Sequence, residues 1–398
     1  MQRQLVLAIY VPTLLLAFCS GLLIPVLPIF VREEFTLSYG LIGLVLAANA
    51  IGMIIGDVPA GALVGRLGLK RSMLIGIAGM ALGTLAFTWA SSVYELILYS
   101  IFVGFASTLW NISRHAYLAE AAPSGQRGRA IAIFGGINRM GSFIGPIVGG
   151  ALGGWLGLRA PFFLYAVLAL IALLFPFWFL VESSQRAPSR GGIRGHTGHL
   201  WHVLRDNYRV LFTAGSGQLF AQMIRSGRGI VVPLFAADIL GLDVSQIGLI
   251  VGLSSAVDMS MFYPAGYVMD RFGRKFAYVP SFAIQALGMA LIPFTGSFLT
   301  LLLATSLIGF GNGLGSGTMM TLGADLAPLG ERSEFLGLWR LIGDGGAMGG
   351  PIVVGWVAGL LGLGPATFVI AGIGLAAALA LGTLVPETLH RSAPSTSA

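Results

Sequence analysis

Ionisable side chains lie inside long apolar stretches of this sequence, where they could exchange protons or hold a charged ligand. Three are aspartates, Asp57, Asp258 and Asp344, and two are arginines, Arg139 and Arg340. Charges in an apolar environment are costly, so they are functional candidates by default. An aspartate that takes up a proton releases its arginine partner, and such a pair could therefore link proton binding to a change of shape.

Two further arginines, Arg225 and Arg228, stand three residues apart and share one face of a helix. With them, four deep arginines meet three aspartates. A surplus of positive charge favours an anionic, zwitterionic or neutral small molecule over a simple cation, and the guanidinium fork suits carboxylate or phosphate groups. The alternative is structural, with both arginines donating to carbonyls of a broken helix near Gly227 and Gly229.

Polar and aromatic side chains in neighbouring apolar stretches could line the same site. Each is weak evidence alone, because polar residues in helix bundles often make packing hydrogen bonds. The candidates are Trp110, Asn111, Asn138, Gln218, Gln222 and Asn312.

The elements that must position these residues are membrane-spanning helices. Of the 398 residues, 56% are hydrophobic and 10% charged, against about 25% charged in soluble domains. Apolar stretches of about 20 residues recur, each long enough to cross a hydrocarbon layer about 30 Å thick. We therefore predict an all-α membrane protein with twelve spans. The spans are 5–31, 39–64, 73–90, 94–118, 129–155, 161–181, 209–238, 245–268, 276–294, 298–322, 334–360 and 364–385.

Charge outside the spans predicts the orientation. Lys and Arg gather on the side of the one long polar stretch, between spans six and seven, and by the positive-inside rule this side is cytoplasmic. The net charge of +7 is thus explained without a nucleic-acid site. We expect a multi-pass protein of the inner (plasma) membrane with both termini cytoplasmic. The predicted divisions are a six-helix bundle at 1–182, a linker at 183–207, a second six-helix bundle at 208–388 and a tail at 389–398.

A few residues carry weaker signals. The linker histidines His196, His199 and His202 are loosely spaced, which indicates a solvated linker rather than a metal site. Cys19 is the only cysteine and is interpreted as a small buried hydrophobe. The uncharged run in span one is too long for a signal-peptide core, so we predict a first membrane helix.

The two halves repeat with a constant offset of 205 residues. The tripeptide at 59–61, Pro-Ala-Gly, recurs at 264–266, and the Gly-Pro pair at 145–146 recurs at 350–351. Glu182 near the end of span six matches Glu387 near the end of span twelve. Two parallel six-helix repeats joined by a cytoplasmic linker are typical of one transporter architecture.

Over essentially its full length the chain resembles the major facilitator superfamily, most closely the drug/proton antiporter branch with twelve spans. The stretch GYVMDRFGRK, residues 266–275, is similar to the family's G-x-x-x-D-R-x-G-R-K loop signature, and residues 61–70 form a poorer copy with Gly65 in place of the acid. We call both stretches gate loops. Their candidate residues are Gly61, Arg66, Gly68, Lys70, Gly266, Asp270, Arg271, Gly273, Arg274 and Lys275.

A glycine-rich stretch in span five resembles the family's antiporter signature. Glycines are also common in membrane helices simply because they allow close packing, so the signature is moderately specific. Its residues are Gly141, Gly145, Pro146, Gly149 and Gly150.

The resemblance implies which charges meet. Span two should face span eleven and span five should face span eight, which predicts the pairs Asp57–Arg340 and Arg139–Asp258. Arg340 and Asp344 are spaced i, i+4, so a pair within one helix competes. The resemblance also implies that Asp270 caps a helix of the other half and latches the inner gate, more strongly than the first-half copy can. The alternative for the ion pairs is that they only hold the two halves together. The alternative for the gate loop is that it is only a turn whose positive charges fix the orientation of the helices in the membrane.

The resemblance implies secondary active transport of a small organic molecule by alternating access, as proton-coupled efflux. One departure weakens the drug/proton mechanism: Ser100 replaces an arginine that the family places in span four. The alternatives are an importer or symporter of an organic anion, and a non-transporting membrane sensor. No enzyme activity or cofactor is expected. The glycine-rich stretch GFGNGLGSG at 309–317 lacks the Lys-Ser/Thr that ends a phosphate-binding loop, and close helix packing explains its glycines better. The expected partners are a small-molecule substrate, protons and membrane lipids, with a monomer as the working unit.

Overall fold

The computed structural model describes residues 5–121, 127–180, 202–328 and 330–389. Within these ranges the chain forms helices and no strands, and each of the twelve predicted spans falls on helix. Among the described residues, ten helices are long and apolar enough to cross a membrane. The long helices α6 (Arg127–Leu156) and α9 (Tyr208–Asp238), which carry the candidate arginines Arg139, Arg225 and Arg228, lie outside that set. The all-α membrane fold is confirmed.

The remaining helices of the first half are η1 (Val6–Tyr10), α2 (Val11–Phe35), α3 (Tyr39–Leu67), α4 (Leu69–Ala86), η2 (Phe87–Trp89), α5 (Val93–Ala121) and α7 (Ala160–Phe179). Those of the second half are α10 (Val244–Ser260), α11 (Phe262–Arg271), α12 (Lys275–Leu291), η4 (Ile292–Phe294), α13 (Phe298–Leu314), α14 (Thr318–Leu326), α15 (Arg332–Leu361) and α16 (Leu363–Leu384).

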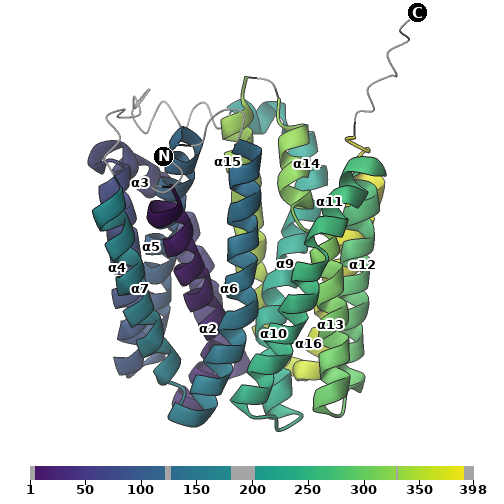
Figure 1. The fold of residues 1–398 in the computed structure, drawn as a ribbon. Helices are drawn as coiled ribbons and strands as arrows, with labels where there is room; N and C mark the ends of the chain where they lie inside the picture. The colour runs from purple at the N-terminus through teal and green to yellow at the C-terminus, as the bar shows by residue number, and fades with distance from the viewer. Residues whose placement is uncertain (1–4, 122–126, 181–201, 329, 390–398) are drawn as a thin grey trace, which may run out of the picture.

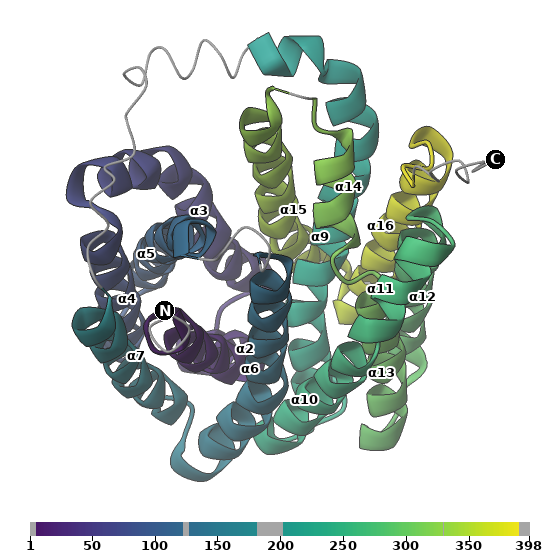
Figure 2. The ribbon, with the colours of Figure 1, turned by 45° about the horizontal axis from the view of Figure 1, so that its top comes forward.

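The two halves stand side by side as six-helix bundles, purple to teal and green to yellow in Figure 1. The start of α2, the end of α7, the start of α9 and the end of α16 lie at one end of the molecule (Figures 1 and 2). We call this the linker end, and the opposite end, where α2 is followed by α3, the far end. Residues 202–206 are helical, with His202 paired to Asp206 at 3.0 Å, whereas His196 and His199 lie outside the described residues.

Two predicted spans are broken rather than continuous. Between α10 and α11 the break falls at Met261, three residues before Pro264, whose ring would clash with the carbonyl four residues back and which lacks an N–H to continue the ladder. Between α13 and α14 it falls at Gly315–Gly317, where Gly317 has a φ of +74°, a value that favours glycine. Both breaks lie in the second half, next to the candidate charges.

Glycines close the halves against each other at the far end. Across the halves α3 packs on α15 and α6 packs on α10, as the resemblance implied. A Cβ at Gly43 would lie 3.0 Å from the Cα of Gly355, and one at Gly150 would lie 2.7 Å from the Cα of Gly248. These two contacts are related by the same 205-residue offset found in the sequence.

The antiporter-like stretch is explained mainly by packing within the first half. Added Cβ atoms at Gly141 and Gly145 would come within 2.5 and 2.6 Å of α2 backbone atoms, and Gly149 also packs on Leu22 of α2. Gly150 instead faces α10 of the other half. Cys19 of α2 faces α7 instead and is buried, with its Sγ 3.7 Å from the carbonyl of Tyr165, as expected for a small hydrophobe.

Polar contacts reinforce the far end. Asp238 at the end of α9 accepts hydrogen bonds from Tyr39 Oη at 2.7 Å and from Arg32 Nε at 3.3 Å, so it joins the halves at this end. The guanidinium of Arg32 also lies over the Tyr39 ring, 5.4 Å from its centroid. Neither Arg32 nor Asp238 was a site candidate from the sequence.

Candidate functional site

A cavity of about 1340 Å³ lies between the two halves. Its walls come from α2, α5 and α6 on one side and from α9, α10, α11, α13 and α14 on the other. The lining residues Asp270, Met320 and Thr321 lie toward the linker end, while the glycine contacts close the far end. The cavity therefore extends from the middle of the molecule toward the linker end.

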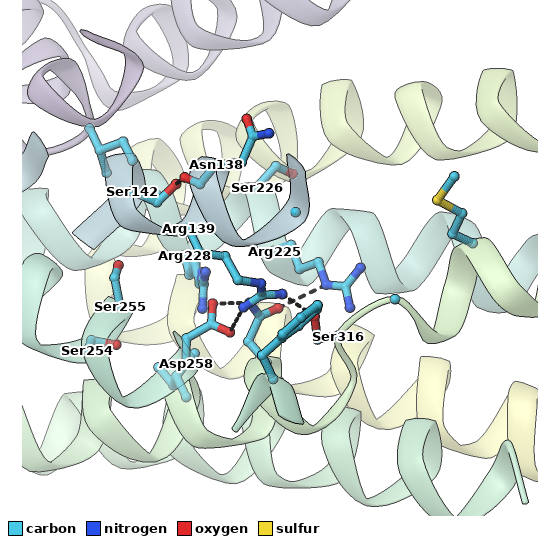
Figure 3. A pocket seen from close by; sticks show the side chains of 18 of the residues that line it. Asn138, Arg139, Ser142, Arg225, Ser226, Arg228, Ser254, Ser255, Asp258 and Ser316 are labelled. Carbon is cyan, nitrogen blue, oxygen red and sulfur yellow. Dashed lines mark hydrogen bonds and ion pairs between the residues drawn. The ribbon is translucent and has the colours of Figure 1, made fainter. Parts of the chain in front are cut away.

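The centre of the cavity holds an ion pair that joins the halves. Arg139 Nη1 of α6 lies 2.7 Å from Asp258 Oδ1 of α10, and Arg139 Nη2 donates to the Ser316 hydroxyl. The other carboxylate oxygen of Asp258 accepts from Asn312 Nδ2 at 2.7 Å. Figure 3 shows Arg139 and Asp258 pointing toward each other. The predicted Arg139–Asp258 pair is confirmed, and both side chains are largely buried, at 21% and 14% exposed.

Arg225 is tied to the protein through several of its donors. Its Nε donates to Asn312 Oδ1 at 3.0 Å, Nη1 to Gln222 Oε1 at 3.4 Å and Nη2 to the Gly315 carbonyl at 3.3 Å. The guanidinium also lies over Phe282, 5.3 Å from the ring centroid. Part of the structural alternative thus holds, since Arg225 does bind a broken helix. The break is at α13–α14, however, and α9 runs unbroken through Gly227.

Arg228 differs from its neighbour. It lines the cavity beside Asp258 (Figure 3), half-buried, and makes no hydrogen bond or ion pair with any described residue. It is attracted by Asp258 and repelled by Arg139 at longer range. Because Asp258 already neutralises Arg139, the centre of the cavity keeps two surplus positive charges, on Arg225 and Arg228.

The second predicted pair is also present, in a looser form. Arg340 Nη2 of α15 lies 3.4 Å from Asp57 Oδ1 of α3, and Arg340 Nε lies 3.5 Å from Asp344 Oδ2. The acid oxygens nearest Arg340 have no hydrogen-bond partner among the described residues, so these are ion pairs without hydrogen-bond geometry. The two predicted pairs, Asp57–Arg340 and Arg340–Asp344, are therefore present at the same time, because Arg340 lies close to both acids.

Four of the predicted lining residues lie elsewhere. Trp110 is 2% exposed and packs in the first-half core, and Asn111 accepts from Arg114 Nη2 at 2.8 Å. Gln218 is buried where α9 meets Gly343 of α15, and Gln222 accepts a hydrogen bond from Arg225. None of the four lines this cavity, because Trp110 and Gln218 face neighbouring helices, while Asn111 and Gln222 accept hydrogen bonds from arginines of their own helices. Asn138 and Asn312 do line it.

Sequence reasoning missed several polar side chains of the cavity. The most informative is Ser316, within the glycine-rich stretch 309–317. Packing does explain Gly311, where a Cβ would meet the Ser281 carbonyl at 2.8 Å. The same stretch also breaks the helix and presents Ser316 and the Gly315 carbonyl to Arg139 and Arg225. Residues that line the cavity and were not predicted include Ser142, Ser226, Ser254, Ser255, Phe262 and Thr305.

The second gate loop is bound within its own half. Asp270, whose side chain is 75% exposed, pairs with Arg274 Nη1 at 2.9 Å instead of capping a helix of the first half. Arg274 Nε lies 3.2 Å from Asp325 of α14, and Lys275 Nζ donates to the Gly382 carbonyl of α16 at 2.8 Å. Among the described residues Asp270 therefore makes no contact with the first half, and the expected latch across the halves is not formed in this state.

The first gate loop has fewer attachments. Lys70 Nζ lies 5.8 Å from the Phe177 ring centroid, and a Cβ at Gly65 would meet nothing within 4 Å. Gly68 has a φ of +86°, which explains one glycine of the signature by its turn. Added Cβ atoms at Gly61 and Gly266 also meet nothing within 4 Å, so close helix approach does not explain these two glycines in this state.

Glu387, three residues after the end of α16, anchors the second gate loop. Its carboxylate accepts from the backbone N–H groups of Arg274 at 2.8 Å and Lys275 at 3.0 Å, which caps α12. A Cβ on Gly273, at a φ of +126°, would lie 2.5 Å from this carboxylate, so only glycine fits. Partial burial raises the pKa of Glu387, but the N–H donors outweigh it and hold the pKa below its ordinary value.

The replacement Glu387→Gln should loosen this loop. Losing a charged acceptor should speed hydrogen exchange of the Arg274 and Lys275 amides by about tenfold. Since the folded pKa is lowered, the wild-type contact is complete above the ordinary glutamate value, roughly 4.3, and is lost only as the pH falls through the lowered value. Protection corrected for intrinsic exchange should therefore be flat from pH 6 to 8. Glu331→Gln is the control, and equal exchange in both variants would contradict the role of Glu387.

The chain is similar to known proteins over most of its length. A family model described as Major Facilitator Superfamily matches residues 9–224 and 214–398. The chain is similar to Multidrug resistance protein 2 of Bacillus subtilis, 26% identical with 77% of each chain covered. It is also similar to the cis,cis-muconate transport protein of Acinetobacter baylyi, 26% identical over 86% of this chain and 84% of the relative. The solved D-xylose-proton symporter superposes with a TM-score of 0.76, at 19% identity, over 97% of this chain and 98% of that chain.

Proposed function

We propose, since the chain belongs to the Major Facilitator Superfamily, that this membrane transporter moves a small organic molecule by alternating access coupled to protons. The observation that carries the proposal is the Arg139–Asp258 pair, which joins the two halves at the centre of the cavity. A proton on Asp258 would weaken the contact between halves that must separate and rejoin in each cycle.

The cationic gate loops support a cytoplasmic linker end, and the state described here is then inward-facing. Asp270 would form its latch with the first half when the linker end closes, and Gly65 would leave the other loop weaker. We place the protein in the plasma membrane with both termini cytoplasmic. The proposed unit is a monomer in contact with lipid, because the two halves of one chain complete the cavity.

Two directions of transport are candidates. Efflux in exchange for protons is supported by the antiporter-like glycines and by the relative named for multidrug resistance. Symport of an organic anion with protons is supported by the surplus charge at Arg225 and Arg228 and by the relative named for cis,cis-muconate transport. The charge of the cavity favours the second.

Purified protein in liposomes that contain a pH-sensitive dye would test the proposal. Hippurate, an aromatic monocarboxylate, and ethidium, an organic cation, are the first probes within a wider panel. Entry of a probe with protons should acidify the lumen, and entry in exchange for protons should make it more alkaline. Compounds that bind the purified protein but never cross the membrane would overturn the proposal in favour of a sensor.

A further inference from the structure

We propose that Arg228 anchors the carboxylate of an organic anion whose apolar body lies toward the far end of the cavity. The inference rests on the proposed function, because it names the substrate class of the same cavity. It begins from the unequal state of the three central arginines. Arg139 and Arg225 are held by hydrogen bonds, whereas Arg228 makes no hydrogen bond or ion pair within the described part of the chain.

The guanidinium of Arg228 has donors to offer. The guanidinium of Arg139 donates to Asp258 and Ser316. The guanidinium of Arg225 donates to three neutral groups, on Asn312, Gln222 and Gly315. Those partners of Arg225 are neutral, so its charge still adds to the positive field around Arg228. A half-buried arginine without an acid partner is costly, and an anion that fills the fork would remove that cost.

Space for a ligand lies directly beside Arg228. A Cβ at Gly229 would meet nothing within 4 Å, and Gly229 lines the cavity. Across the cavity stand Asn138 and Ser142 of α6 and Ser255 of α10 (Figure 3). Ser142 and Ser255 donate to carbonyls of their own helices, at 3.1 and 2.9 Å, which leaves their oxygens as acceptors for polar groups of a ligand.

The wall toward the far end is mainly apolar, and the hydroxyls of its Ser254 and Thr305 donate to carbonyls of the protein. One turn beyond Arg228, α9 presents Val232 and Pro233, and α2, α10 and α13 add Ile24, Val251 and Ile308. These helix segments run to the closed end, where no described acid lines the cavity. The layout suits an amphiphilic monocarboxylate with its charged group at Arg228 and its hydrocarbon or aromatic part buried beyond it.

Charge arithmetic favours an anion over a cation. The groups that face the centre are Asp258 from α10, Arg139 from α6, and Arg225 and Arg228 from α9, one negative against three positive. Asp270, Arg114 and His115 line the cavity nearer the linker end. A cation would have to displace Arg139 from Asp258, whereas an anion meets a donor that is already free.

Binding to detergent-purified protein, measured by calorimetry, tests this inference. The probes are hippurate and hexanoate, their uncharged amides, and benzylammonium as the cation. Wild type should bind the two carboxylates and show at least tenfold weaker binding of the amides and the cation. Arg228→Gln should weaken carboxylate binding at least tenfold, and Arg228→Lys, which keeps the charge but not the fork, should recover part of it.

Two variants separate ligand binding from a structural role. Arg228→Gln should unfold at the same or a higher temperature than wild type, because it removes a repulsive charge and no protein contact. Gly229→Leu should also abolish carboxylate binding by filling the space, while Gly61→Leu, at another open position, should not. A fall in the unfolding temperature of Arg228→Gln with unchanged binding, or equal binding of acids and amides by wild type, would overturn the inference. Carboxylate binding without flux would refute transport alone, and proton-linked flux of ethidium without carboxylate binding would refute the Arg228 site alone.

Discussion

Asp258→Asn should abolish proton-driven accumulation of substrate while leaving exchange of labelled for unlabelled substrate measurable. Asparagine cannot take up the proton, and it leaves Arg139 without its counter-charge at 2.7 Å. Removing one partner of a buried pair costs about 3–5 kcal/mol, so net uptake driven by a pH gradient should fall about 100-fold or more. The measurement is hippurate uptake into liposomes with and without an imposed gradient, alongside counterflow at equal pH.

A double-mutant cycle separates this pair from a general weakening of the cavity. Arg139→Gln with Asp258→Asn removes both charges, and the double variant should be better tolerated than either single change. Additive losses would show that the two residues act independently. Retained proton-driven accumulation in Asp258→Asn would move the coupling role to another acid.

Asp57 and Asp344 are the matched comparison. Both are acids near a single arginine, but their contacts with Arg340 are 3.4 and 3.5 Å and lack hydrogen-bond geometry. Asp258 by contrast accepts from two donors at 2.7 Å, one from each half of the molecule. We therefore expect Asp57→Asn and Asp344→Asn to slow transport without removing its dependence on the pH gradient.

The sequence predicted what depends on periodicity and on repeats. Long apolar stretches were enough for the helical fold, and the 205-residue offset was enough for two repeated halves. The facing helices, and hence the pairs of Arg139 and Arg340, followed from the resemblance to the family. Depth along a helix follows from counting residues, so charges at equal depth on facing helices could be matched. The sequence also showed that the two gate loops differ, because the second has Asp270 where the first has Gly65.

Rotation about each helix axis was beyond the sequence. Trp110 and Gln218 lie in apolar stretches as Asn138 and Asn312 do, yet the first two face neighbouring helices and the last two face the cavity. The break at Gly315–Gly317 was missed for a related reason, because a glycine-rich stretch can pack closely, break a helix, or do both. The partner of Asp270 could not be predicted either, since it depends on which end of the molecule is closed.

Leucine at Gly43 or Gly248 should prevent closure of the far end and stop transport. A Cβ at Gly43 lies 3.0 Å from the Cα of Gly355, and one at Gly248 lies 2.8 Å from the Cα of Gly150, so a larger side chain must push the halves apart. Overpacking costs about 1–3 kcal/mol, enough to shift the balance of states roughly 5- to 150-fold toward one open at the far end. The pseudo-symmetric variants should behave alike.

The single cysteine makes this shift directly measurable. Cys19 is buried and can be replaced by alanine, after which Ser255→Cys reports access to the cavity wall. A membrane-impermeant maleimide should label this cysteine from the linker end in the parent protein and from the far end once Gly43 or Gly248 is leucine. Leucine at Gly372, where a Cβ meets nothing within 4 Å, is the control for the substitution itself. Labelling that stays at the linker end in the Gly43 and Gly248 variants would mean that the glycine contacts do not hold the far end closed. A variant that switches access but keeps Asp258 intact should still change its labelling rate when a pH gradient is imposed, because Asp258 takes no part in the glycine contacts of the far end.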